Sequence, residues 1–322
     1  PEDALDYLSS NSLIEAGSLN YQLQVQREPN DPAWDDSSTD LWGHRFVGVT
    51  DAWNTTTGST STVVAVIDTG IDLSHVDLVD NLARLPDAPE TVAGWDLVDG
   101  DTTPQDENGH GTHVAGIIGA AGDNSIGSVG LNWDVTILPI RVFDAEGQGS
   151  LWNAALGIML AAEAGAKVIN ASWGIDIDQP GPLLEATQYA IERGALIVAS
   201  AGNNARDLSD ENFFPATLLD HQENRAILSV GSLTRDGSPS PTSNFGSSGD
   251  LWAPGRSIWS TLPGDTYGFE QGTSSAAAYV AGIAALYASV VPDATGSDIA
   301  SKLKSTSAEA EFGLLVNAAN VL

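Results

Sequence analysis

Short runs of apolar, β-branched residues alternate with helical patterns along most of the chain. One run is Val63-Val64-Ala65-Val66-Ile67, and similar runs recur further on. Strands that are apolar throughout are typical of parallel sheets covered on both faces. We therefore expect an α/β domain of three layers, in which helices flank both faces of a mainly parallel central sheet. The expected strands are 62–67, 135–142, 167–171, 196–199 and 226–230, and the expected helices are 112–121, 151–164, 183–193 and 275–290.

The N-terminal segment has a different pattern from the rest. Apolar residues between positions 4 and 14 fit one face of a helix, and residues 21–26 alternate like an edge strand. Pro29-Asn30-Asp31-Pro32 then breaks the pattern, as a linker or turn would. We expect residues 1–28 to be separate from one domain at 29–322.

The chain is strongly acidic. Its 12 Lys and Arg residues against 43 Asp and Glu residues give a net charge of −31. Phosphate binding needs clustered cations, so we expect no nucleic-acid partner. The same charge favours a hydrated surface and the binding of cations such as calcium. No Cys is present, which excludes disulfides and thiol catalysis, and no stretch approaches the roughly 20 apolar residues of a membrane span.

Polar residues follow the expected strands at three places. Asp68 ends the first strand, His110 precedes a helix, and Asn203 follows the strand near residue 199. In such sheets, sites gather beyond the carboxyl ends of the strands. A fourth residue, Ser274, follows Gly272-Thr273 at the start of a small-residue helix, where free N–H groups suit a developing oxyanion.

Each of these residues also has an ordinary structural explanation. Asp68 could form a turn, His110 could lie on the surface, Asn203 could belong to a loop, and Ser274 could be a helix N-cap. The order Asp, His, Asn and Ser along one α/β chain is much harder to obtain by accident.

The segments around these residues resemble the catalytic motifs of the subtilisin-like serine proteases, in particular the thermitase branch. They are Val66-Ile67-Asp68-Thr69-Gly70, His110-Gly111-Thr112-His113-Val114-Ala115-Gly116 and Gly272-Thr273-Ser274. The resemblance implies a serine endopeptidase of broad specificity that acts through an acyl-enzyme intermediate. In it Ser274 is the nucleophile, His110 the general base and Asp68 the residue that orients His110. Asn203 and the backbone N–H of Ser274 would form the oxyanion hole.

Substrate residues follow from the same resemblance. Two backbone segments would hold an extended peptide as added strands. If Phe213 points inward, it would shorten the pocket for the residue before the scissile bond and favour small side chains. The Phe214–Pro215 bond is a candidate cis peptide. The expected substrate residues are Gly147, Gln148, Gly149, Ser172, Trp173, Gly174, Ser200, Gly202 and Phe213.

Two calcium sites are expected. Three carboxylates within six residues of one loop repel one another unless a cation lies among them, and hard oxygen ligands suit calcium. The alternative is a solvated acidic turn. The resemblance assigns Asp96, Asp99, Asp101, Thr103 and Gln105 to this loop site. It assigns Asp31, Asp77, Asn124, Ile126 and Ser128 to a second site, which would attach the N-terminal arm to the domain.

The sequence departs from the family after the nucleophile. The family usually carries Met-Ala-Ser/Thr-Pro-His there, whereas this chain reads Ser275-Ala276-Ala277-Ala278-Tyr279. Ser275 removes a thioether that peroxide would oxidise. Residues 1–28 resemble the end of an inhibitory prodomain and would be a prodomain remnant or an N-terminal extension. The prodomain itself would be a folding aid and inhibitor.

Further expectations concern location and the competing functions. We expect a secreted monomer that acts on proteins and peptides and has no membrane partner. No signal peptide is recognisable, so any export signal would already have been removed.

His113 is expected to be structural, since His-Gly-Thr-His lacks the glutamate of His-Glu-x-x-His metalloproteases. An α/β-hydrolase esterase is disfavoured because that fold places Ser before Asp and His. A catalytically inactive relative that binds peptides remains the alternative.

Overall fold

The computed structural model describes residues 27–37, 41–221, 226–246 and 251–322. The helix expected within residues 4–14 and the edge strand expected at 21–26 lie outside these ranges.

A nine-stranded sheet forms the centre of the domain, in the order β12-β13-β9-β8-β7-β6-β1-β5-β4. Neighbouring strands pair in parallel, except for the antiparallel pair β12–β13. The predicted three-layer α/β fold is therefore confirmed. The strands are β1 (Gly58–Asp68), β4 (Trp95–Asp96), β5 (Asp134–Arg141), β6 (Val168–Ala171), β7 (Leu196–Ser200), β8 (Ile227–Leu233), β9 (Leu251–Pro254), β12 (Ala308–Ala310) and β13 (Gly313–Leu315).

Both faces of the sheet are buried, which explains the continuous apolar runs. In β1, Val64 and Val66 pack into one hydrophobic cluster, while Ala65 and Ile67 pack into the other. Successive side chains of a strand point to opposite faces, so a strand between two helical layers has no polar face.

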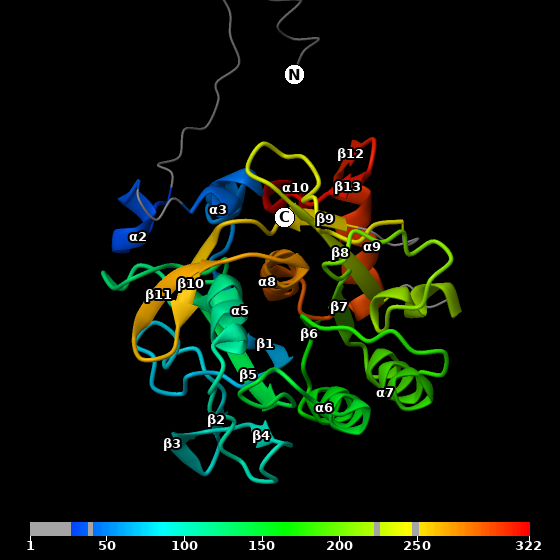
Figure 1. Ribbon diagram of the computed structural model, residues 1–322. Coiled ribbons are helices and arrows are strands. Elements are labelled where there is room, and N and C mark those ends of the chain that lie inside the picture. The colour runs from blue at the N-terminus through cyan, green and yellow to red at the C-terminus, as the bar shows by residue number, and fades with distance from the viewer. Residues whose placement is uncertain (1–26, 38–40, 222–225, 247–250) are drawn as a thin grey trace, which may run out of the picture.

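Helices cover the two faces (Figure 1). Helices α6 and α7 pack over one cluster, while α5, α8, α9 and α10 contribute to the other. Helix α8 is long and apolar enough to cross a membrane, but 78% of it is buried within the domain, as in a core helix. The helices are α2 (Pro32–Asp35), α3 (Trp42–Phe46), α4 (Val49–Ala52), α5 (His110–Gly119), α6 (Leu151–Glu163), α7 (Gly181–Glu192), the 3₁₀ helix η1 (Ala216–His221), α8 (Thr273–Val290), α9 (Gly296–Thr306) and α10 (Ala318–Val321).

Two antiparallel hairpins lie outside the main sheet. They are β2 (Arg84–Leu85) with β3 (Ala88–Val92), and β10 (Ile258–Leu262) with β11 (Thr266–Glu270). The second hairpin is fixed to α5, because Oγ of Ser260 donates to the carbonyl of His113 at 2.8 Å and Oγ1 of Thr261 donates to that of Thr112 at 2.8 Å. It thus borders the region where β1 ends and α5 begins.

The five expected strands and four expected helices are present, with shifted ends. Strand β1 starts four residues earlier than expected, and β8 extends to Leu233. His110 is the first residue of α5 and does not precede the helix, because its neighbour Gly111 allows the helix to begin directly against the strand end. Strands β4, β9, β12 and β13 were not expected, since they contain only two to four residues each.

Candidate active site

Asp68 and His110 meet at the carboxyl end of β1. Asp68 is the last residue of β1, and Nδ1 of His110 lies 2.7 Å from Oδ1 of Asp68. Gly111 permits this approach, because a Cβ there would lie 2.1 Å from the carbonyl oxygen of Gly70 and 3.1 Å from Cβ of Asp68. A larger residue after His110 would push α5 away from β1 and separate the pair.

The loop that leads to His110 is held by the buried carboxylate of Asp106. Its Oδ1 accepts hydrogen bonds from the backbone N–H groups of Asn108 and Gly109, both at 2.9 Å. Its Oδ2 accepts from the N–H of Thr112 at 2.9 Å and from its hydroxyl at 2.6 Å. These four bonds fix the start of α5 and therefore the backbone of His110. The signal in the sequence is Asp106-Glu107-Asn108-Gly109, since Asp and Asn side chains hydrogen-bond to the backbone in turns.

The charges around His110 favour its protonated form. Burial disfavours the imidazolium, but the carboxylates of Asp68, Glu270 and Asp106 outweigh this effect and raise the pKa of His110 to about 9. The side chain of His110 is 31% exposed, whereas that of Asp68 is 1% exposed. His110 is thus accessible from solvent, whereas Asp68 is buried.

Ser274 is the second residue of α8, at the end of the helix where N–H groups are free. The turn into the helix is made by Gly272, whose φ of 150° is a conformation that other residues avoid. Oγ of Ser274 donates to the carbonyl of Ser172 at 2.9 Å. The hydroxyl of Ser172 in turn donates to the carbonyl of Ser274 at 3.0 Å and accepts from Nδ2 of Asn170 at 2.9 Å.

The hydroxyl of Ser274 is not yet bonded to the imidazole. Within the described ranges, no hydrogen bond joins Oγ of Ser274 to His110. Catalytic hydrogen bonds are often long or poorly aligned without substrate and form only in the complex.

Asn203 follows β7, and its amide reaches the N-terminus of α8. Oδ1 of Asn203 accepts from the N–H of Thr273 at 2.9 Å, and Oγ1 of Thr273 accepts from the N–H of Gly202 at 3.0 Å. This leaves Nδ2 of Asn203 without a partner among the described residues. Nδ2 lies 3.2 Å from the position that a Cβ on Gly272 would occupy. An amide donor is thus held next to the turn that carries Ser274.

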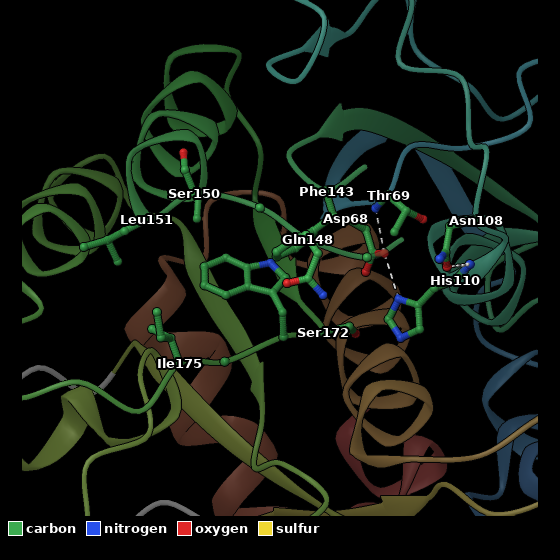
Figure 2. Close-up of a pocket in the computed structure, with 15 residues that line it drawn as sticks. Asp68, Thr69, Asn108, His110, Phe143, Gln148, Ser150, Leu151, Ser172 and Ile175 are labelled. Carbon is green, nitrogen blue, oxygen red and sulfur yellow. Dashed lines mark hydrogen bonds and ion pairs between the residues drawn. The ribbon is translucent and has the colours of Figure 1, made fainter. Parts of the chain in front are cut away.

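A cavity of about 450 Å³ opens beside Asp68 and His110 and is lined by both predicted backbone segments, 147–149 and 172–174. Figure 2 shows His110 and Asn108 at one end of it and Leu151 and Ile175 at the other. Apolar lining makes up the far end. The lining residues that the sequence did not indicate are Thr69, Asn108, Phe143, Ser150, Leu151, Ala154 and Ile175.

Trp173 shapes the floor of this cavity. Its indole Nε1 donates to the carbonyl of Ile67 at 2.8 Å, and its ring packs edge-on against Phe143 with centroids 5.9 Å apart. Gly149 brings its backbone close to Phe143, since a Cβ there would lie 2.5 Å from Cδ1 of that ring. The rings of Trp173 and Phe143, which both line the cavity, are thus fixed in place.

The other predicted substrate residues form a second group. Ser200, Gly202 and Phe213 do not line the cavity beside His110. The ring of Phe213 packs between two glycines, because an added Cβ would lie 2.2 Å from it at Gly174 and 2.9 Å at Gly202. Ser200 is buried at the end of β7. The Phe214–Pro215 peptide is cis, as predicted.

Asp31 and Asp77 are buried carboxylates that both contact Asn124. Asp31 accepts from the N–H groups of Asp123 at 2.7 Å and Asn124 at 3.3 Å. Asp77 accepts from Nδ2 of Asn124 at 3.1 Å and from the N–H of Ser128 at 2.7 Å. Burial raises the pKa of both carboxyls, although these bonds act against it. In the described part of the chain, no Lys or Arg forms an ion pair with either residue.

A basic side chain from β5 lies among the carboxylates of the acidic loop. Nη1 of Arg141 donates to Asp96 at 2.8 Å and to Asp99 at 2.9 Å, and Nη2 donates to Glu107 at 2.7 Å. Arg141 thus places a positive charge among these carboxylates, and calcium binding at this loop stays a prediction. Strand pairing explains the position of Arg141, because Asp96 and Arg141 are register partners between β4 and β5.

The remaining predicted ligands of the loop already hold hydrogen bonds. Oδ1 of Asp101 accepts from the N–H of Thr103 at 2.7 Å, and Oε1 of Gln105 accepts from the N–H of Leu73 at 3.2 Å. Among the described residues, no group of three or more His, Cys, Asp or Glu side chains has a geometry suited to a metal ion.

Comparisons with known sequences identify the family. The sequence profile of the subtilase family matches residues 59–319. Thermitase from Thermoactinomyces vulgaris is 39% identical over 261 residues, which cover 81% of this chain and 85% of thermitase. A thermophilic serine proteinase from Bacillus sp. strain AK1 is 38% identical over 288 residues, which cover 89% of this chain and 66% of that protein.

Solved structures agree with this assignment. A protease from Pseudoalteromonas arctica has a TM-score of 0.79 at 30% identity and covers 91% of this chain and 98% of its own. A cold-adapted subtilisin-like serine proteinase has a TM-score of 0.69 at 32% identity and covers 80% of this chain and 88% of its own. The chain therefore belongs to the subtilase family, as its three motifs indicated, and its enzyme class is that of the subtilisin-like serine endopeptidases.

Proposed function

We propose that the protein hydrolyses peptide bonds through Ser274, His110 and Asp68, with broad specificity. The 2.7 Å bond between Asp68 and Nδ1 of His110 is the observation that carries this proposal. Nδ1–H donates to Asp68, so Nε2 presents its lone pair to the cavity and acts as the general base. Nε2 takes the proton of Ser274 during attack and gives it to the leaving amine, and Asp68 stabilises the imidazolium between these steps.

The oxyanion that forms during attack is bound by Nδ2 of Asn203 and the backbone N–H of Ser274. Two observations support this role: Oδ1 of Asn203 is already taken by Thr273, and Nδ2 lies beside Gly272. Because both donors are fixed before the reaction, they favour the charged intermediate over the ground state.

The substrate binds in an extended form between the segments 147–149 and 172–174. Both segments line the cavity next to His110, and main-chain hydrogen bonds need no particular side chain. Phe213 closes the pocket for the residue before the scissile bond, because its ring fills the space between Gly174 and Gly202. A higher kcat/KM for Ala than for Phe at this substrate position tests that role, and equal values would exclude it.

Calcium stabilises the folded domain at the site formed by Asp31, Asp77 and Asn124. Burial and the charge of Asp77 both raise the pKa of Asp31, and none of the described Lys or Arg side chains pairs with either carboxylate, so a bound cation would relieve their repulsion. The carbonyls of Ile126 and Ser128 would complete the oxygen ligands, and the ion would join the N-terminal arm to the domain. Binding at the acidic loop remains a prediction, since Arg141 occupies two of its carboxylates.

The proposal also covers the domain organisation of the protein and its cellular location. Residues 29–322 act as one peptidase domain, and residues 1–28 are a prodomain remnant or an N-terminal extension. The protein is secreted and monomeric, and its own prodomain assists folding and inhibits the enzyme. Its membership of a protease family supports protein and peptide substrates.

A second function, peptide binding without catalysis, has one observation in its favour. Oγ of Ser274 donates to Ser172 and not to His110. Labelling with a fluorophosphonate, together with casein hydrolysis, separates the two functions. We expect labelling and hydrolysis by the parent protein and neither by the Ser274→Ala variant. Casein binding without labelling of Ser274 would establish the inactive alternative.

A further inference from the structure

Glu270 is an acidic residue at the end of β11, four residues before Ser274. Its Oε2 lies 3.8 Å from Nδ1 of His113, which is one helical turn after His110 in α5. Nε2 of His113 bonds to the carbonyl of Ile258 at 3.0 Å. These contacts fix the hairpin on α5, so the position of the Glu270 carboxylate is set by the fold.

The carboxylate of Glu270 is partly open to solvent. Its side chain is 34% exposed, and no Lys or Arg in the described ranges forms an ion pair with it. The buried ring of His113 does not neutralise it, because burial lowers the pKa of His113 to about 4. Its charge does act on His110, whose pKa it helps to raise. Glu270 therefore presents a negative charge to solvent next to His110.

Glu270 does not line the cavity beside His110. The cavity beside His110 is lined by residues between 68 and 175, and no residue of the β10–β11 hairpin takes part. Figure 1 shows that hairpin and α6, whose N-terminus borders the cavity, on opposite sides of α5. A peptide whose acyl half occupies the cavity must continue past Ser274 and His110. Its leaving half therefore passes the hairpin.

We propose that Glu270 determines specificity by attracting a cationic side chain, Lys or Arg, in the residue directly after the scissile bond. This inference rests on the proposed hydrolysis by Ser274 and His110. A half-buried carboxylate beside a bound cation interacts more strongly than a fully exposed pair, because less water separates the charges. It also disfavours Asp or Glu at the same place, so attraction and repulsion both contribute to the selection.

Three fluorogenic peptides that differ only in this residue, with Lys, Leu or Glu, test the proposal. For the parent enzyme at low salt, we expect kcat/KM to be about tenfold higher for Lys than for Leu, and lowest for Glu. In the Glu270→Gln variant the three values should converge. Glu270→Asp keeps the charge on a shorter side chain and should give an intermediate ratio, which provides a second reading if the first variant folds poorly.

A matched control separates this local effect from the overall charge of −31. Glu309 is an exposed residue of β12, so Glu309→Gln removes the same charge elsewhere on the surface. The proposal is overturned if Glu270→Gln keeps the parent ratio, or if Glu309→Gln lowers the ratio equally. Failure of the proposed function would look different, since the parent enzyme would then cleave none of the three peptides.

Discussion

The phenolic oxygen of Tyr279 lies 3.0 Å from Nδ1 of His44, and both side chains are 1% exposed. The subtilase pattern has histidine at the position of Tyr279, so the aromatic ring is a departure that the structure accommodates. Gly43 leaves room for it, because a Cβ there would lie 2.3 Å from that oxygen. This contact attaches α3 to α8, the helix that carries Ser274.

Removal of this hydroxyl should destabilise the domain. In Tyr279→Phe the buried Nδ1 of His44 loses its partner, which costs about 1–3 kcal/mol of unfolding free energy. Tyr287→Phe on the same helix is the matched control, since its hydroxyl makes no hydrogen bond among the described residues. Urea unfolding of both variants measures the difference. Equal free energies for the two variants would show that the bond contributes nothing.

The side chain of Asn203 should contribute to kcat and not to substrate binding. In subtilisin, loss of the corresponding donor lowers kcat by about 10²–10³, and we expect a similar loss for Asn203→Ala with KM little changed. Asn204→Ala is the control, because Asn204 is also exposed and its side chain makes no hydrogen bond to any residue that the structure describes. A large rise in KM with normal kcat would instead assign Asn203 to substrate binding.

Much of this site was predictable because a parallel sheet brings distant residues together. Asp68 and Asn203 follow strands, and the carboxyl ends of parallel strands meet at one edge. The sequence could not predict the partner of each side chain. Arg141 reaches Asp96 only through the pairing of β4 with β5, and β4 has two residues, too few for a recognisable pattern.

Glu270 was missed for a related reason. Glu270 and His113 lie far apart in the sequence. Their contact depends on how the β10–β11 hairpin packs on α5. Similarly, Asp106 was not singled out, although its turn pattern is visible in the sequence, because its bonds from Thr112 and from the hydroxyl of Thr69 depend on how α5 packs against the end of β1.

Activity should rise with pH up to the alkaline range. His110 acts as a base only when neutral, and the nearby carboxylates raise its pKa to about 9. The acid limb of kcat/KM should therefore lie well above pH 6.5, the ordinary histidine value. A pH profile with a small neutral peptide measures it. An acid limb at or below pH 6.5 would show that the carboxylates do not control His110.

Deprotonation of His110 should also lower the stability of the folded protein over the pH range in which activity rises. Because the folded-state pKa of His110 is raised, its charge stabilises the fold fully below pH 6.5, and this contribution is lost as pH increases towards 9. Melting temperature should thus decrease over this window. In Asp68→Asn the decrease should be smaller, since the main partner of the imidazolium is gone. An identical decrease in both proteins would assign it to other groups.

Removal of calcium should destabilise the domain through Asp31 and Asp77. A ligand that binds only the folded state stabilises it by mass action, about 2.7 kcal/mol at a hundredfold excess over Kd. EDTA should therefore lower the melting temperature of the parent protein. Asp31→Asn and Asp77→Asn should remove this effect, whereas Asp99→Asn in the acidic loop should retain it. Persistence of the full EDTA shift in Asp77→Asn would place the ion elsewhere.

Resistance to peroxide should follow from Ser275. The family usually has methionine at this position next to the nucleophile, and Ser275 is a buried residue in the first turn of α8. The single methionine of the chain, Met159, lies on α6 and is 37% exposed, so its oxidation should leave the active site intact. We expect the parent enzyme to keep its kcat in peroxide, while Ser275→Met should lose most of its kcat. A separate aliquot of each enzyme, titrated with a fluorophosphonate before peroxide is added, gives the concentration of active enzyme. Rapid inactivation of the parent would show that another group near Ser274 is the sensitive one.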